Sequence, residues 1–128
     1  MSNDFRIDGI AQIHISVEDL PRAVGFYRDV LGLKLLFEVP GQSMAFFDCG
    51  GVRLYLGKPE KPEHRSASFI YYHVPSMTEA VDTLRQRGVE FNGEPHAVHR
   101  TDAHTLWLAA FRDLDGNYLH LMSEVPHA

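Results

Sequence analysis

Cysteine and long hydrophobic runs are both scarce in this chain of 128 residues, and each shortage excludes a class of protein. Cys49 is the only cysteine, so no disulfide can form within the chain, which fits a reducing compartment. No apolar run approaches the roughly 20 residues that a membrane-spanning helix needs. The first residues also lack the basic start and apolar stretch of a signal peptide. We therefore expect a soluble, cytoplasmic protein with no membrane partner.

Basic residues are outnumbered by acidic ones, which bears on the possible partners. Lysine and arginine together number 12, against 17 for aspartate and glutamate, and the formal net charge is −5 at pH 7. Proteins bind nucleic-acid backbones through basic surfaces, so we expect no nucleic-acid partner. A hydrophobic content of 45% at this length suits one compact domain, 1–128, whose core needs no disulfide.

The chain does contain an internal repeat. A strand-like segment at 12–17 runs into a helical pattern at 19–31, which stops at a glycine. The segment at 69–74 runs into a second helical pattern at 76–87, which also stops at a glycine. Asp19 is a plausible N-cap for the first helix, and serine and glutamate in the second form a capping box.

The closing segments of the two halves match as well. Positions 46–56 correspond to 111–121 at a constant offset, with Phe, Asp, Gly and Leu in the same places. We therefore predict two tandem repeats, 8–57 and 69–124, joined by a polar linker at 58–68 that holds prolines.

Short strands are predicted to follow each helix, because alternating apolar residues are bounded by turn signals. They fall at 34–39, 44–48 and 52–57, and at 89–92, 96–100, 106–112 and 118–122. This order gives two β-α-β-β-β units, an α+β fold. The helices cover one face of the sheets, and the other faces curl into a cup.

Two segments carry a resemblance to a known family. Residues 17–32, VEDLPRAVGFYRDVLG, and 111–117, FRDLDGN, resemble motifs of the vicinal oxygen chelate superfamily, with Leu114 where the family has proline. That superfamily holds glyoxalases, bleomycin-resistance proteins, fosfomycin-resistance enzymes and extradiol dioxygenases. The resemblance covers residues 8 to 124. It implies a glyoxalase-like, cup-shaped mixed sheet, a small organic ligand and a homodimer.

The resemblance also implies a divalent metal in the cup, held by four positions. In this chain those positions fall on Gln12, Tyr55, Phe69 and His120. Phenylalanine has no lone pair to donate, and neutral tyrosine, with an ordinary pKa near 10, is a poor ligand. We therefore predict no metal and no other cofactor at the family position.

A shifted metal site is an alternative. It would combine His120 with His14 and His73. His14 lies two residues beyond Gln12, and His73 lies four residues beyond Phe69. At the rise of a strand these offsets are roughly 7 and 13 Å. Metal–nitrogen bonds are only about 2 Å long, so such a site needs the strands to slide out of register.

The period of the strands places a mixed set of polar and aromatic side chains on the cup face. An apolar wall with a few convergent polar groups is the usual composition of a small-molecule pocket, although a half-buried sheet face without a ligand has the same pattern. The candidate ligand-binding residues are Gln12, His14, Arg53, Tyr55, Phe69, Tyr71, His73, Trp107 and His120.

Two functions are open at this point. The first is a metal-free small-molecule-binding protein of the bleomycin-resistance type. The second is a glyoxalase- or dioxygenase-type enzyme, a lyase or an oxidoreductase, which would use a divalent metal on the shifted site or acid–base catalysis by histidine. The ordinary histidine pKa near 6.5 suits the latter role, but the sequence identifies no catalytic residue.

Overall fold

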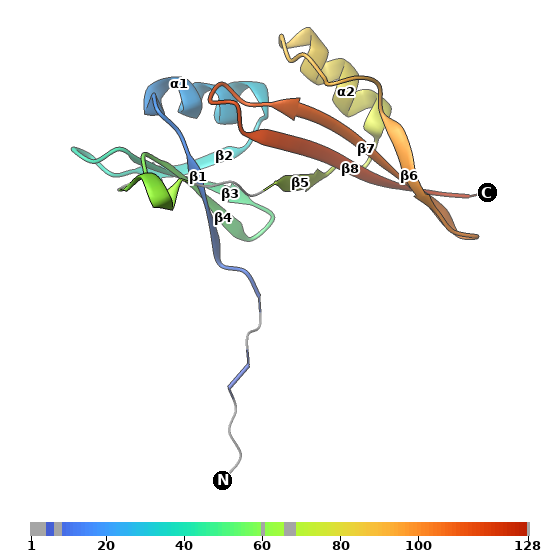
Figure 1. Ribbon diagram of the computed structural model, residues 1–128, viewed down its shortest axis with the longest axis horizontal. Coiled ribbons are helices and arrows are strands. Elements are labelled where there is room, and N and C mark those ends of the chain that lie inside the picture. The colour runs from blue at the N-terminus through green and yellow to red at the C-terminus, as the bar shows by residue number, and fades with distance from the viewer. Residues whose placement is uncertain (1–4, 7–8, 60, 66–68, 128) are drawn as a thin grey trace.

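A computed structural model of the chain describes residues 5–6, 9–59, 61–65 and 69–127. Two units follow each other along the chain (Figure 1). The first contains β1 (Gln12–Ser16), α1 (Leu20–Gly25), the π-helical η1 (Phe26–Val30), β2 (Lys34–Glu38), β3 (Met44–Cys49) and β4 (Val52–Gly57). A 3₁₀ turn, η2 (Pro62–His64), lies in the linker. The second contains β5 (Ile70–His73), α2 (Met77–Gln86), β6 (His96–Arg100), β7 (His104–Arg112) and β8 (Tyr118–Pro126).

Each unit forms its own four-stranded mixed sheet, and the strand order is the same in both. The orders are β1-β4-β3-β2 and β5-β8-β7-β6, with one parallel pair, β1 with β4 and β5 with β8. This confirms the α+β class. In the described part of the chain no backbone pairing joins the two sheets. Figure 1 shows them spread along the long axis of the molecule, so the cup is not closed by pairing within one chain.

The helix boundaries follow the local signals. Asp19 Oδ1 accepts a hydrogen bond from the Arg22 amide at 3.2 Å, and Ser76 Oγ accepts one from the Glu79 amide at 3.3 Å. The predicted helix at 19–31 is α-helical only in α1 and continues as the π-helical η1. The spacing of apolar residues does not distinguish these two kinds of helix over so few residues. Within the described residues, no helix is long and apolar enough to cross a membrane.

One buried core serves both units. Val17, Tyr27 and Phe47 of the first unit belong to the same apolar cluster as Phe111 and Leu121 of the second. The two units therefore pack together through their helix-covered faces. The opposite faces of both sheets are left toward solvent.

The predicted strand at 89–92 is wrong. Only an isolated bridge forms there, between Phe91 and Phe111, and Gly93 follows with a φ of 88°. A turn at Asn92 and Gly93 redirects the chain before a second pair of strand residues can align. The β7 and β8 strands are instead longer than predicted.

Candidate functional site

The turn between β7 and β8 joins the two units. Asp113 is buried, and its Oδ2 accepts hydrogen bonds from Tyr27 Oη and from Asn117 Nδ2, both at 2.8 Å. Its Oδ1 accepts from the amides of Asp115 at 2.9 Å and Asn117 at 2.8 Å. Burial raises the pKa of Tyr27 well above its ordinary value, and the Asp113 charge raises it further. We call this cluster of Tyr27, Asp113 and Asn117 the inter-unit latch.

Two further contacts extend the latch to the end of β1. Asn117 Nδ2 also donates to the Ser16 carbonyl oxygen at 3.0 Å, and Asp115 Oδ1 accepts from the Glu18 amide at 2.8 Å. The FRDLDGN motif therefore positions one unit against the other. Its Asp113, Asp115 and Asn117 make these contacts, whereas Arg112 of the motif contacts Tyr118.

The exposed side of the first sheet carries a row of rings, which we call the first aromatic face. His14 is opposite Tyr55 in register, and their ring centroids lie 4.7 Å apart. Phe46 stacks on Tyr55 at 4.8 Å and on Phe37 at 4.6 Å. The Arg53 guanidinium lies over the Phe46 ring. The row thus combines one cation, one imidazole and three aromatic rings.

His14 differs electrostatically from an exposed histidine. Partial burial lowers the pKa of its imidazole, and the charge of His64 lowers it further. A hydrogen bond with the Gly57 backbone opposes these effects. The imidazole is therefore neutral at pH 7, when one ring nitrogen can accept a proton or a hydrogen bond.

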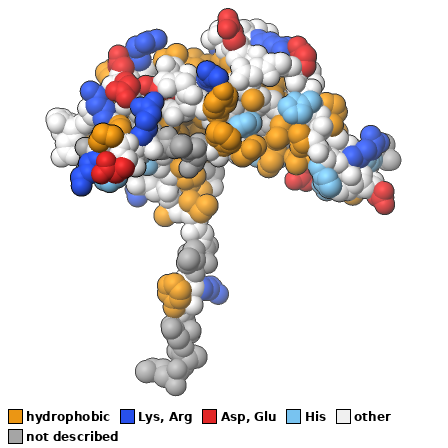
Figure 2. All heavy atoms as spheres, viewed as in Figure 1, with side chains coloured by type: hydrophobic (Ala, Val, Ile, Leu, Met, Phe, Trp, Pro, Cys, Tyr) orange, Lys and Arg blue, Asp and Glu red, His pale blue; other side chains and the backbone are white. Residues whose placement is uncertain are grey.

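The second sheet carries the second aromatic face. His120 is opposite Tyr71 in register and stacks on it at 4.4 Å, while Phe69 lies 5.6 Å from the His120 ring and 5.7 Å from the Tyr118 ring. Phe69 is 60% exposed and Tyr71 is 48% exposed. The Nδ1 atom of His120 is buried and has no hydrogen-bond partner among the described residues. Figure 2 shows hydrophobic side chains and histidines gathered over the region of β5, β7 and β8.

The structure brings the predicted residues together in two groups. Gln12, aligned with Arg53, joins His14 and Tyr55 on the first sheet. Phe69, Tyr71, His73 and His120 share the outer side of the second sheet. In the described part of the chain no ring contact links the two groups.

Trp107 does not belong to either group. Ala110 is opposite His120, whereas Trp107 is opposite Ser123, which is 1% exposed. Because positions 107 and 110 are three residues apart and so on opposite sides of the strand, the indole lies on the helix-covered face and packs against the core. The sequence pattern placed Tyr118 on the same face as His120, although it was not among the candidate ligand-binding residues. Phe37 and Phe46 were missed, and the same parity argument could have found them once the strand register was known.

The four family metal positions do not fit a divalent ion. Gln12 and Tyr55 lie on one sheet, and Phe69 and His120 on the other. No group of three or more His, Cys, Asp or Glu side chains suited to a metal occurs among the residues that the structure describes. The shifted set of His14, His73 and His120 is therefore not assembled.

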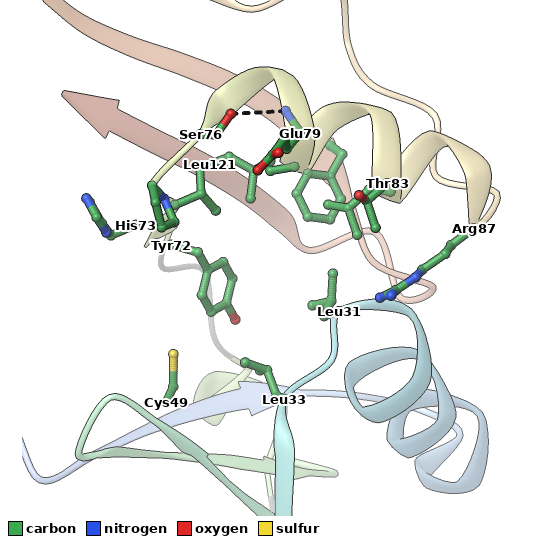
Figure 3. Close-up of a pocket in the computed structure, with 15 residues that line it drawn as sticks. Leu31, Leu33, Cys49, Tyr72, His73, Ser76, Glu79, Thr83, Arg87 and Leu121 are labelled. Atoms are coloured by element: carbon green, nitrogen blue, oxygen red, sulfur yellow. Dashed lines mark hydrogen bonds between the residues drawn. The ribbon is translucent and has the colours of Figure 1, made fainter. Parts of the chain in front are cut away.

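A cavity of about 420 Å³ opens elsewhere, on the helix side of the second sheet. It lies between α2, the end of β5 and the first unit (Figure 3). His73 is the only residue among the predicted ligand-binding set that lines it. Burial raises the pKa of the lining Cys49 thiol, and Asp48 raises it further, so this thiol is not activated as a nucleophile.

The fold thus consists of two units of equivalent strand order, each with an aromatic face on its own sheet. The chain belongs to the Glyoxalase/Bleomycin resistance protein/Dioxygenase superfamily, whose family model matches residues 9–121. This confirms the resemblance of its motifs.

Relatives and solved structures agree with this membership. The metallothiol transferase FosB of Staphylococcus epidermidis is 34% identical over 68 residues, which are 53% of this chain and 48% of FosB. A superfamily member from Sphaerobacter thermophilus is 26% identical at a TM-score of 0.77, covering 92% of this chain and 98% of that one. The antibiotic-binding protein TnmS3 of Streptomyces sp. CB03234 is 23% identical at a TM-score of 0.74, covering 94% and 98%. The match to FosB thus spans about half of that protein's length.

Proposed function

We propose that this protein binds a small organic molecule with a flat apolar part on its aromatic faces, without the family's divalent metal. The observation that carries the proposal is the environment of His120. Its ring is stacked on Tyr71 and close to Phe69, and its buried Nδ1 has no partner among the described residues. A buried polar atom without a partner costs free energy, and a ligand atom that bonds to it would remove this cost.

The chemistry of the two faces indicates what kind of ligand fits. Aromatic rings offer stacking worth about 0.5–1.5 kcal/mol per well-placed pair beyond their burial. Arg53 adds a cation beside the first aromatic face, which favours a carbonyl or anionic group on the ligand. The similarity in fold to an antibiotic-binding protein supports the same ligand class.

A homodimer is part of the proposal. Part of each aromatic face is exposed within its own chain: Phe37, Phe69 and Tyr71 are 46%, 60% and 48% exposed, whereas Phe46 is 8% exposed. Exposed apolar patches of this kind mark interaction sites. If the first aromatic face of one chain lay opposite the second aromatic face of its partner, a flat ligand would be held between them.

The second candidate is an enzyme that uses His14 as a base. Its favouring observation is the lowered pKa of His14, whose imidazole is neutral at pH 7 beside Tyr55. Partial similarity to a metallothiol transferase fits an enzyme, but the residues do not fit the metal. Binding without turnover is therefore the function that we favour.

The test is a titration of the protein with a panel of flat aromatic antibiotics, followed by heteronuclear NMR. We expect shifts at Tyr71 and His120, and a loss of about 1–3 kcal/mol of binding free energy in His120→Ala. His96→Ala, two strands away on β6, is the matched control and keeps the affinity.

Two measurements separate the parts of the proposal. Elemental analysis that finds one transition metal per chain, lost in His120→Ala, would overturn the metal-free site. Sedimentation that finds only a 14.5 kDa species at micromolar concentration would overturn the dimer. Conversion of a bound compound to product, lost in His14→Ala, would favour the enzyme.

A further inference from the structure

The helix-side cavity is separate from both aromatic faces. Its floor includes Phe111 and Leu121 of the second sheet, whereas His120 lies next to Leu121 in sequence and therefore on the opposite side of that sheet. Its other walls come from α2 and from Leu31, Leu33 and Cys49 of the first unit. At about 420 Å³ it falls within the range of roughly 300–1,000 Å³ that is usual for ligand pockets.

The charges around the cavity balance. Glu79 and Arg87 of the α2 region both line it, one acid beside one arginine, together with the imidazole of His73. Arg87 Nη1 donates to the Val30 carbonyl oxygen at 2.7 Å, which ties the end of α2 to the first unit. The remaining walls are mainly apolar. This composition favours a neutral, carbon-rich occupant over an ion.

Tyr72 places a hydroxyl without a hydrogen-bond partner, among the described residues, in the wall of the cavity. Its ring lines the cavity, and its hydroxyl is buried without a hydrogen-bond partner in the described part of the chain. Figure 3 shows this hydroxyl directed toward Leu31 and Leu33, with α2 across the cavity. Nearly all buried polar groups in folded proteins have a partner, so an unpaired tyrosine hydroxyl in a cavity wall indicates a missing one.

We propose that this cavity is a second small-molecule site, which takes a neutral, carbon-rich compound bearing one hydroxyl or carbonyl oxygen. The carbon frame packs against Leu121, Phe111 and Leu84, and the oxygen bonds to Tyr72 Oη between Leu31 and Leu33, which the bound molecule displaces slightly. The site depends on neither the aromatic faces nor the dimer.

The test compares 1-naphthol with naphthalene, which differ by one hydroxyl group. Binding of each is measured by fluorescence and NMR titration of the full chain. The wild-type protein is expected to bind 1-naphthol about 5- to 10-fold more tightly than naphthalene, as one hydrogen bond provides. Tyr72→Phe keeps the ring and is expected to bind both probes equally. If Tyr72→Phe retained the preference for 1-naphthol, the role of the hydroxyl would be refuted.

Location is tested by filling the cavity. Ala80→Phe, on the α2 wall, is expected to abolish binding of both probes, and Thr83→Phe is the second filling variant if Ala80→Phe is unfolded by circular dichroism. Thr78→Phe, exposed on the outer side of α2, is the matched control and keeps both affinities. No binding to the wild-type chain at 0.2 mM probe, on the order of naphthalene's solubility, overturns the proposal, as does binding lost in His120→Ala but kept in Ala80→Phe.

Discussion

Two tyrosines with buried hydroxyls, Tyr27 and Tyr72, are expected to respond in opposite ways to the same substitution. Tyr27 is fully buried, and its hydroxyl donates to the Asp113 carboxylate at 2.8 Å. Hydrogen bonds to charged groups contribute about 1.5–3 kcal/mol. Tyr27→Phe removes the donor and leaves the ring, so we expect the free energy of unfolding to fall by about 1.5–3 kcal/mol. For a domain of this size that is a large share of the roughly 5–15 kcal/mol available.

Tyr72→Phe removes a hydroxyl that has no partner among the described residues. Removing such a group abolishes a desolvation cost and breaks no bond. The free energy of unfolding is therefore expected to stay constant or to rise by up to about 1 kcal/mol.

The assay is urea unfolding followed by circular dichroism at pH 7, with the wild-type chain and three variants. Tyr71→Phe, at a 48% exposed position, is the control and is expected to stay within about 0.5 kcal/mol of wild type. Equal losses in Tyr27→Phe and Tyr72→Phe would refute the reasoning, because both variants keep the ring and the pairing of the hydroxyl would then make no difference. A loss below about 0.5 kcal/mol in Tyr27→Phe would refute the latch itself.

Three further predictions concern pH and helix capping. Burial raises the pKa of both Tyr27 and Tyr72. The neutral hydroxyls therefore contribute their full stability below the unfolded-state tyrosine pKa of about 10. Above that pH the free energy of unfolding declines, by up to about 1.4 kcal/mol per pH unit for each tyrosine. Urea midpoints above pH 10 should fall less steeply in Tyr27→Phe, and an unchanged slope contradicts this. The His14 pKa is lowered, so its NMR titration midpoint should lie below about 6.5 and its contribution to stability should be lost as pH falls below that value; a midpoint above it contradicts the burial of the ring. Ser76→Ala removes the N-cap of α2 and should cost about 0.5–2 kcal/mol in urea unfolding, whereas an equal cost in Thr78→Ala would show that the cap is not responsible.

Local signals predicted much of the fold. Asp19 and Ser76 start helices because their side chains accept the first free amides, and that need arises within a few residues of sequence. The alternation in β1 and β5 predicted that His14 and Tyr71 share the outer face of their sheets with Tyr55 and His120. In the structure each parallel pair holds one register, so His14 lies opposite Tyr55 and Tyr71 lies opposite His120.

Long-range packing could not be predicted in the same way. Trp107 was grouped with the candidate ligand-binding residues although the sequence did not fix its side of the sheet, because only the pairing of β7 with β8 decides which face the indole takes. The helix-side cavity forms between α2 and the first unit, and no segment taken alone contains its walls. The unpaired hydroxyl of Tyr72 is likewise a result of how the two units meet.

The inter-unit latch distinguishes the two units, whose strand orders are equivalent. Tyr27 stands in the first helix where Leu84 stands in the second, at the same distance from the N-cap. Asp48 corresponds to Asp113, but its Oδ1 accepts only from the nearby Gly51 amide, at 3.3 Å, in the contacts described here. Leu84 and Cys49, which follows Asp48 in the chain, line the helix-side cavity instead. One latch thus joins the two units, and the equivalent position in the second unit, Leu84, contributes to the cavity wall instead.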